Sequence, residues 1–281
     1  MTIQLAENNY GKSRIRLLRV VRQDGRHDIR ELTLAISFAG DFETAHTKGD
    51  NSKILPTDTM KNTVYALARQ YPVEAVEDFS LHLIEHFLTY NPQVARVGIA
   101  AEETLWNRIV IGGKPHASAF LCPGAEQRTA ALTGTREGAT IRAGIADLIV
   151  LKTAKSAFEG FLRDPYTTLK EDRNRILSTS IHADWLYESG EIEFSQHWHG
   201  IRQTMLETFA EHDSESLQHT LYAMGEAVLK NFDRLREIHL SLPNKHFNLV
   251  DLSPFGTDNP AQVFLPTDEP HGLIEATLRR E

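Results

Sequence analysis

The feature that most constrains the fold is an order of strands and helices that occurs twice along the chain. Residues 14–21 are rich in Ile, Leu and Val, residues 32–38 are apolar at every second position, and a turn signal lies between them. This predicts a β-hairpin, and two helical patterns and further strands follow it. The second half has the same order. Hairpins with helices on one face predict an antiparallel sheet of the α+β class.

Apolar spacing separates the expected helices from the expected strands. The first helix is predicted from about Asp58 to Gln70, with Thr57 or Asp58 as its N-cap, and the second between Pro72 and Asn91. One stripe of the second helix is apolar: Val76, Phe79, Leu83 and Phe87. Two helices of the second half follow the apolar series Ile201, Met205, Phe209 and Leu217, Leu221, Met224, Val228. Strands are expected at residues 93–108, 117–121, 128–132, 140–152, 177–187 and 238–242, the last closed by Pro243-Asn244.

The duplicated order predicts two modules, residues 1–136 and 137–281. No Pro-, Gly- or Ser-rich linker separates them, so we expect the halves to share one structure. A chain of this length buries most of its apolar surface without disulfides or metals.

Composition excludes several classes of protein. The 281 residues include 30 Lys+Arg and 38 Asp+Glu, a net charge of −8, which argues against a general nucleic-acid binder. The single cysteine, Cys122, excludes an internal disulfide framework and a Cys-rich zinc module. No stretch of about 18 apolar residues predicts a membrane-spanning helix, and the first residues lack a signal-peptide core, so we expect a cytoplasmic protein.

Histidine pairs and a basic cluster are the first candidate functional groups. His82 and His86 are four residues apart on a predicted helix, and His197-Trp198-His199 is expected on an extended segment. We favour surface positions over metal ligation for both pairs. Seven basic residues crowd residues 12–30, and we favour a solvated strand face over an anion-attracting channel. Nucleotide-binding loops and hydrolase elbows are absent.

Three polar segments are unusual for parts of a chain that only support the fold. Residues 55–63 precede a helix whose N-terminus offers free N–H donors, although a simple capping motif also explains them. Residues 158–170 form a long aromatic and charged connection, of the kind that carries function or packs as an Ω-loop. His246 follows a strand, where a histidine titrates near neutral pH but is more often structural.

Together these segments resemble the urate oxidase (uricase) family, of the bacterial type. The resemblance spans nearly the whole chain and rests on four motifs in order: Tyr10-Gly11-Lys12, Thr57-Asp58-Thr59-x-Lys61-Asn62-Thr63, Phe161-x-Arg163-Asp164-x-Tyr166-Thr167-Thr168-Leu169 and Ser241-Leu242-Pro243-Asn244-Lys245-His246. The resemblance implies two tandem tunnelling-fold (T-fold) modules per chain. It also implies a homotetramer with active sites at subunit interfaces.

The resemblance implies the substrate contacts. Arg175 would grip one edge of urate with its planar guanidinium, and Gln218 would offer a donor and an acceptor. The backbone N–H groups of Asp58 and Leu217 would contact the substrate, although many relatives have valine where this chain has Leu217. Two more residues complete the implied binding set: Phe158, stacked on the purine ring, and Asn244, beside the dioxygen site.

The resemblance also implies the chemistry. Lys12, Thr57 and His246 match the catalytic residues, with Lys12 and the Thr57 hydroxyl moving a proton from urate or water and His246 relaying it. Lys12 and Thr57 would come from one subunit and the other site residues from its neighbour. Electron-rich urate then reduces dioxygen directly, giving 5-hydroxyisourate and hydrogen peroxide, so the expected enzyme needs no metal and no cofactor.

Two alternatives stay open. Another T-fold enzyme, acting on a purine or pterin with zinc, would need three converging His or Cys ligands, and Cys122 is the only thiol. A non-catalytic binding or structural homologue would not need Lys12, Thr57 and His246 together.

Overall fold

The computed structural model describes residues 3–281, and the contacts divide the chain into two compact units. The first contains the chain as far as Gly144, together with Ser189–Trp198. The second contains Ile145–Glu188 and His199–Glu281. The modules expected at residues 1–136 and 137–281 remain a prediction from the repeat.

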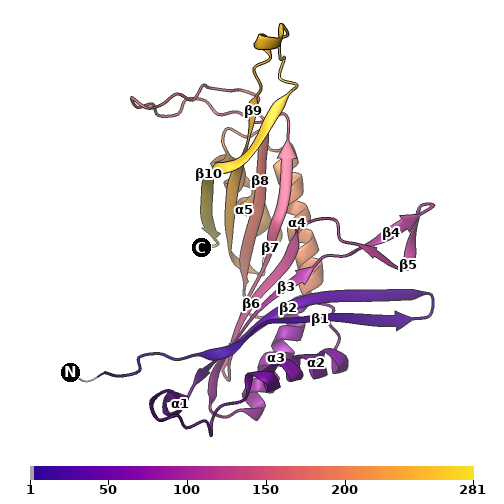
Figure 1. Cartoon of the computed structure of the whole chain (residues 1–281), viewed down its shortest axis with the longest axis vertical. Coiled ribbons are helices and arrows are strands. Elements are labelled where there is room, and N and C mark those ends of the chain that lie inside the picture. Colours follow the sequence, from indigo (N-terminus) through magenta and orange to yellow (C-terminus); the bar gives the residue numbers. More distant parts are fainter. Residues whose placement is uncertain (1–2) are drawn as a thin grey trace. The chain divides into compact units, whose positions relative to one another are not determined.

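The strands of the first unit form the predicted hairpin and its continuation (Figure 1). β1 (Tyr10–Gln23), β2 (Arg26–Gly40), β3 (Val94–Thr104) and β6 (Gln127–Thr135) pair antiparallel in the order β1-β2-β3-β6. β4 (Asn107–Ile111) and β5 (Lys114–Leu121) form a separate two-stranded ribbon. The stretch expected as one strand over residues 93–108 is therefore two strands that belong to different sheets.

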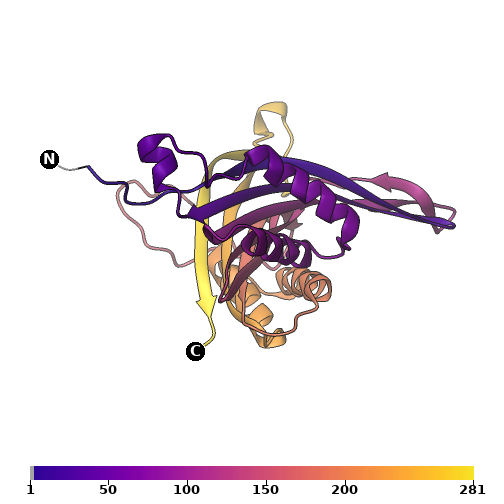
Figure 2. The same ribbon diagram turned by 90° about the horizontal axis from the view of Figure 1, so that it is seen from below.

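Helices cover one face of these strands. α1 (Glu43–Lys48) is short, while α2 (Thr57–Gln70) and α3 (Val76–Tyr90) lie side by side against the sheet (Figures 1 and 2). The predicted stripe of α3 is confirmed, because Val76, Phe79, Leu83 and Phe87 are at most 1% exposed.

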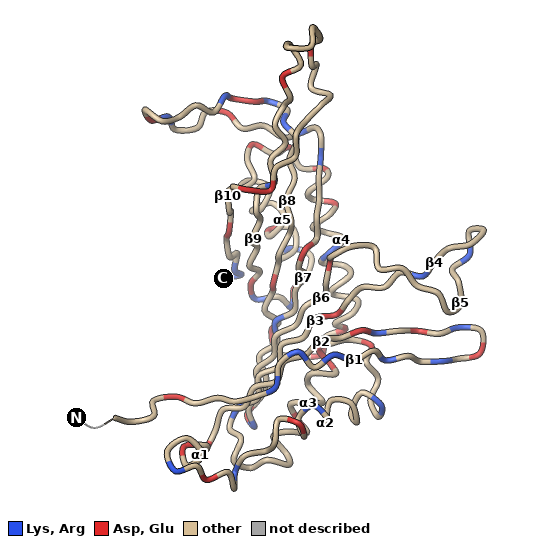
Figure 3. Tube along the Cα trace, in the orientation of Figure 1, with Lys and Arg blue, Asp and Glu red and all other residues tan. Residues whose placement is uncertain are grey.

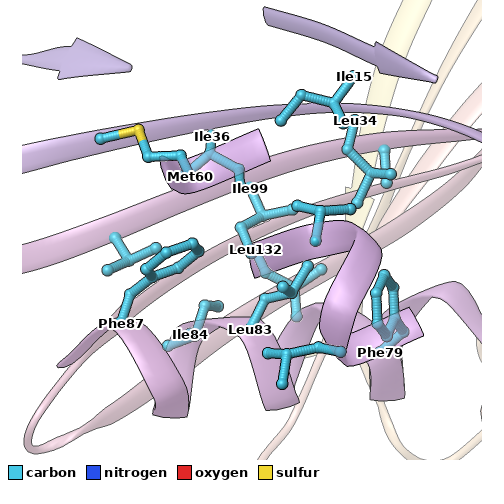
Figure 4. Packing of buried hydrophobic residues seen from close by; sticks show 14 of the residues in the cluster. Ile15, Leu34, Ile36, Met60, Phe79, Leu83, Ile84, Phe87, Ile99 and Leu132 are labelled. Atoms are coloured by element: carbon cyan, nitrogen blue, oxygen red, sulfur yellow. The ribbon is translucent and has the colours of Figure 1, made fainter. Parts of the chain in front are cut away.

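The core of the first unit lies between α2, α3 and the sheet (Figure 4). The alternating positions of β2 point into it, since Leu32, Leu34, Ile36 and Phe38 are at most 2% exposed. α3 approaches β6 closely: a Cβ at Gly134 would lie 2.2 Å from Ile84 Cγ2. A larger residue at Gly134 would therefore clash with the buried Ile84 side chain, which would have to move.

The second unit has the same plan. β7 (Gly138–Lys152) leaves the first unit at Gly144, and the second unit continues with β8 (Leu177–Tyr187), β9 (Leu235–Leu249) and β10 (Phe264–Arg279) in that order. The pairs β8–β9 and β9–β10 are antiparallel. α5 (Leu217–Asn231) packs against β9 and β10. α4 (Phe194–Glu211) begins in the first unit and belongs to the second from His199 onward, and a short 3₁₀ turn (Ser253–Phe255) follows β9.

Three local predictions are wrong. Neither Thr57 nor Asp58 caps α2: Thr57 is its first residue, Pro56 is the N-cap, and no side chain caps the helix. His197-Trp198-His199 lies inside α4 and not on an extended segment; the buried Trp198 indole donates to Gly144 O at 2.9 Å. Pro243-Asn244 does not close a strand, because β9 continues through both to Leu249.

The basic cluster follows β1 and the hairpin it makes with β2, interrupted by acidic residues (Figure 3). Arg16 pairs with Glu31 at 3.0 Å, and Arg30 pairs with Glu103 at 2.8 Å. Part of the cluster is thus neutralised by neighbouring strands. Within residues 3–281, no helix has the length and apolar content that crossing a membrane requires.

One ion pair of the first unit is fully buried. Glu77 of α3 is 0% exposed and Arg128 of β6 is 3% exposed, and the two side chains are hydrogen-bonded. Arg128 also contacts Ser195 Oγ at 3.3 Å and lies over the Trp198 ring at 5.7 Å. Because charges taken from water are costly when unpaired, this pair fixes α3 against β6 and against the first turn of α4.

Arg128→Met removes one partner of the buried pair and leaves Glu77 uncompensated. We expect a loss of about 3–5 kcal/mol of unfolding free energy, measured by urea titration with circular dichroism. Arg16→Met, at an arginine whose side chain is 67% exposed, is the matched control and should cost at most about 1 kcal/mol. Equally small losses of unfolding free energy in both variants would mean that the buried pair contributes no more to stability than the exposed pair does.

Candidate active site

The motif Tyr10-Gly11-Lys12 opens β1, and its glycine is required by close packing. A Cβ at Gly11 would lie 1.8 Å from Ile36 O of β2, so no larger residue fits without moving the strands apart. Glycine here lets β1 approach β2 immediately before Lys12.

A β-bulge then turns Lys12 toward the helix-covered face. Lys12 pairs with Ile36 and Ile15 pairs with Leu34, so two residues of β1 lie opposite one residue of β2. Arg14, inside the bulge, has a φ of 56°. Directly paired residues share a face, and Ile36 and Leu34 are both buried under the helices. Regular alternation would have placed Lys12 and Ile15 on opposite faces, and the bulge places them on the same one.

Tyr10 ties this strand to the segment before α2. Its hydroxyl accepts the Leu55 N–H at 3.0 Å, and its ring packs edge-on against Phe42, with the centroids 4.8 Å apart. Burial raises the pKa of Tyr10. Because Leu55 is two residues before Thr57, the same tyrosine positions both Lys12 and the start of α2.

The first turn of α2 presents Thr57 and Asp58. The Asp58 carboxylate accepts from Lys61 Nζ at 2.5 Å and from Asn62 Nδ2 at 3.0 Å, which explains the spacing of this motif. The hydrogen bond from Lys61 is the main cause that lowers the pKa of Asp58, and Lys12 contributes a smaller electrostatic effect. The structure thus brings Lys12 and Asp58 within electrostatic reach, at a helix N-terminus whose first N–H groups lack helical partners.

In the second unit, Phe158 and Arg175 form one arrangement. The Arg175 guanidinium lies over the Phe158 ring, 5.2 Å from its centroid, and the backbone of Phe158 pairs with Asp172 through hydrogen bonds of 2.7 and 3.2 Å. The Arg175 N–H donates to Ser156 O at 2.8 Å. Burial lowers the pKa of Arg175, and its Nε is buried without a hydrogen-bond partner among the described residues. A half-buried guanidinium with a free, buried Nε–H donor can pair with an anion.

The connection after Phe158 is held by its own residues. The Phe161 ring stacks on Phe158 with the centroids 5.0 Å apart. Asp164 accepts from the Tyr166 N–H at 2.9 Å and from Thr167 Oγ1 at 2.8 Å. Arg163 donates to Leu169 O at 3.3 Å. The third motif therefore encodes a compact loop.

The N-terminus of α5 carries two more of the predicted residues. Ser216 is the N-cap, and its Oγ accepts the His219 N–H at 3.1 Å. Leu217 and Gln218 are the first two helical residues, so their N–H groups are left without helical acceptors. Leu217 anchors the turn with a buried side chain, while Gln218 is exposed.

Asn244 and His246 lie on β9 where its partner strand is irregular. Asn244 pairs with Gly272 and His246 pairs with Thr267, so a longer segment of β10 lies opposite the single residue Lys245. Two residues apart on one strand, Asn244 and His246 face the same side. Thr179 Oγ1 donates to Pro243 O at 2.9 Å and so fixes β9 against β8 just before this site.

The predicted site residues therefore fall into two groups. The first unit holds Lys12, Thr57 and Asp58 around one helix N-terminus. The second unit joins Phe158 to Arg175 and presents Leu217, Gln218, Asn244 and His246 from two other elements. Sequence reasoning missed Ser156 and Asp172, which hold Arg175 and Phe158 through backbone atoms. No side-chain pattern signals such contacts.

The histidine pair of α3 packs against aromatic side chains of the first unit. His82 stacks on Tyr71 with the ring centroids 4.3 Å apart, and His86 packs against Tyr90 at 4.7 Å. Burial lowers the pKa of His86. Across residues 3–281, no three His, Cys, Asp or Glu side chains are placed to hold a metal ion together.

Comparison with known proteins identifies the family of this chain. The sequence model of the family described as Uricase matches residues 8–133 and 141–275. The uricase of Arthrobacter globiformis is 45% identical over 279 residues, which cover 99% of this chain and 91% of that protein. The uricase of Aspergillus flavus is 39% identical over 289 residues, covering 96% of this chain and 95% of that protein.

The solved structures agree with this result. The crystal structure of the Arthrobacter globiformis uricase superposes with a TM-score of 0.94 over 100% of this chain and 96% of that chain. The resemblance drawn from the four motifs, to a bacterial-type relative, and the α+β class are confirmed. The chain therefore belongs to the uricase family of urate-oxidising enzymes.

Proposed function

We propose that this chain oxidises urate with dioxygen and water to 5-hydroxyisourate and hydrogen peroxide, without a metal or organic cofactor. The balance is one urate, one O₂ and one water for one 5-hydroxyisourate and one H₂O₂. Urate loses two electrons and gains a hydroxyl from water at C5, and dioxygen takes the two electrons and two protons. The observation that carries the proposal is the half-buried Arg175 guanidinium over Phe158, whose buried Nε has no hydrogen-bond partner among the described residues and is free for an acceptor on an anionic purine.

The second unit supplies substrate binding. Arg175 pairs with adjacent acceptors at one edge of the urate anion, in the bidentate manner that a planar guanidinium favours. Phe158 stacks on the ring, and the Leu217 N–H and the Gln218 amide bind the remaining edge. Together these four contacts hold a flat anion in one orientation, which the electron transfer to dioxygen requires.

The first unit supplies proton transfer. The bulge directs Lys12 to the face where α2 begins, and Asp58 lies within electrostatic reach of it. In this proposal Lys12 takes the proton of the Thr57 hydroxyl, and that hydroxyl in turn takes a proton from urate or from the attacking water. Asn244 holds dioxygen above the ring, and His246, on the same face of β9, relays a proton to the peroxide product.

The electronic properties of urate explain why no cofactor is required. Deprotonated urate is electron-rich enough to reduce dioxygen in one-electron steps, so the protein only orients the substrate, moves protons and holds oxygen. The sequence correspondingly lacks the motifs that bind nucleotides or flavins. We also propose that the reaction takes place in the cytoplasm.

Assembly completes the proposed site. We infer a homotetramer in which Lys12, Thr57 and Asp58 of one subunit face the binding residues of the next. Support comes from the second unit, whose loop exposes Leu162 at 94% and Tyr166 at 89% of their surface. Large apolar side chains this exposed are typical of surfaces that another chain covers.

Chelator-treated, metal-free protein tests the proposed reaction. We expect loss of urate absorbance under air, with one O₂ consumed and one H₂O₂ formed for each urate. Lack of urate consumption would refute the proposal. Activity that disappears on chelation and returns with zinc would favour a metal-dependent T-fold enzyme instead.

Arg175→Ala should weaken urate binding. Removing the charged partner of a buried anion costs about 1.5–3 kcal/mol, or about 10- to 150-fold in Kd, measured by titration under nitrogen so that no turnover occurs. Arg175→Lys keeps the charge and should recover only part of the loss, since it lacks the planar pair of donors. Arg173→Ala, at an exposed arginine paired with Glu159 at 2.9 Å, is the control and should bind as the wild type does. Unchanged affinity in Arg175→Ala would mean that another residue holds the anion.

Lys12→Met should lower kcat by about 10²- to 10⁴-fold while changing KM far less, because Lys12 acts on protons and Arg175 binds the anion. Steady-state oxygen uptake over a range of urate concentrations separates the two constants. Lys48→Met, at the exposed end of α1, is the matched control. Parallel changes in kcat and in affinity would assign Lys12 a positioning role.

A further inference from the structure

Ser214 lies between the two elements that carry most of the proposed substrate contacts. Its backbone is in a parallel bridge with Ser156: the Ser214 N–H donates to Lys155 O at 3.0 Å, and the Ala157 N–H donates to Ser214 O at 2.7 Å. Ser214 is 2% exposed and Ser156 is 1% exposed, so these bonds are shielded from water.

One side of this bridge leads to Phe158 and Arg175. The bridged segment runs directly into Phe158, and Ser156 O accepts the Arg175 N–H at 2.8 Å. The backbone of Ser156 is thus the common support of the ring and the guanidinium. Any shift of Ser214 moves both, because three successive backbone hydrogen bonds connect them.

The other side of Ser214 leads to the start of α5. Ser214 Oγ donates to Ser216 O at 2.9 Å and accepts from Thr220 Oγ1 at 2.7 Å. Ser216 is the N-cap of α5, and Thr220 is fully buried in its first turn. One hydroxyl therefore fixes both ends of the turn that presents Leu217 and Gln218.

We propose that Ser214 is a positioning residue for urate binding: it sets the distance between the Phe158–Arg175 pair and the N-terminus of α5. This inference rests on the proposed function of that site. Ser214 touches no substrate atom in this proposal, and its effect passes through Ser156 on one side and through Ser216 and Thr220 on the other. A planar anion gripped at two edges is sensitive to this distance, since a displacement of about 1 Å weakens both grips at once.

The test removes the hydroxyl link while leaving the backbone bridge intact. In Ser214→Ala and in Thr220→Val, we expect KM for urate and the anaerobic Kd to rise about tenfold, with kcat falling less than about threefold. Proton transfer should keep its rate because, among the described residues, no hydrogen bond of Ser214 or Thr220 reaches Lys12, Thr57 or His246. Thr220→Ser keeps the hydroxyl and should restore wild-type KM.

Thr208→Val is the matched control. Its Oγ1 donates to Thr204 O at 2.8 Å within α4. Replacing Thr208 therefore removes a hydroxyl hydrogen bond inside a helix but leaves the Ser156–Ser214 bridge unchanged. We expect a comparable change in the thermal midpoint and no change in KM. A lower midpoint with wild-type KM in Thr220→Val would overturn the proposal and leave the hydroxyl pair a purely structural role.

Three further outcomes each have a defined meaning. If Ser214→Ala does not fold, the pair Thr220→Val and Thr220→Ser answers the same question, since equal KM values in the two would refute the proposal. If wild-type protein consumes no urate, the proposed function fails. Active wild-type protein with unaffected Thr220→Val refutes the positioning role alone.

Discussion

An antiparallel sheet that is covered by helices on one side can bury only one of its two faces, and the placement of the site depends on this constraint. Alternating apolar residues decide which face is buried, as in β2, where Leu32, Leu34 and Ile36 are almost inaccessible to solvent. Polar side chains reach the covered face either within the alternation and paired, as Arg128 of β6 is with Glu77, or where the alternation is interrupted. The bulge of β1 does this for Lys12, and the cost of the interruption is carried by Arg14, held at a φ of 56°.

The period of apolar residues made most of the fold predictable, because one side chain per helical turn and every second side chain of a strand face the core. α3, α5 and β8 follow directly from it. The prediction failed where the pattern is short or weak. Three residues such as His197-Trp198-His199 fit either period, and burial of Trp198 against Gly144 O decides for the helix. β10 has no fully buried position, and only its last part, from Ile274 to Leu278, alternates apolar with polar residues.

The residues of the candidate site were harder to predict from local sequence patterns. Arg175 carries no local signal of its own, and only the resemblance of the surrounding motifs pointed to it. Its supports, Ser156 and Ser214, act through backbone atoms and buried hydroxyls, which single-sequence patterns do not encode. Tyr10 is an intermediate case: the motif drew attention to it, but its bond to Leu55 N–H emerges only in the fold.

The charges of the site also reconcile an acidic chain with an anionic substrate. The net charge of −8 is a sum over the whole sequence, whereas the proposed contacts are local cations and free N–H groups. Arg175 is the sharpest case, since burial disfavours its charge and leaves Nε without an acceptor among the described residues. The face of the Phe158 ring attracts the Arg175 guanidinium and so offsets part of the free energy lost when the charge is taken out of water. In the proposed site this half-buried guanidinium is already oriented, so the acceptor that an incoming urate anion would supply requires no reorganisation of the side chain.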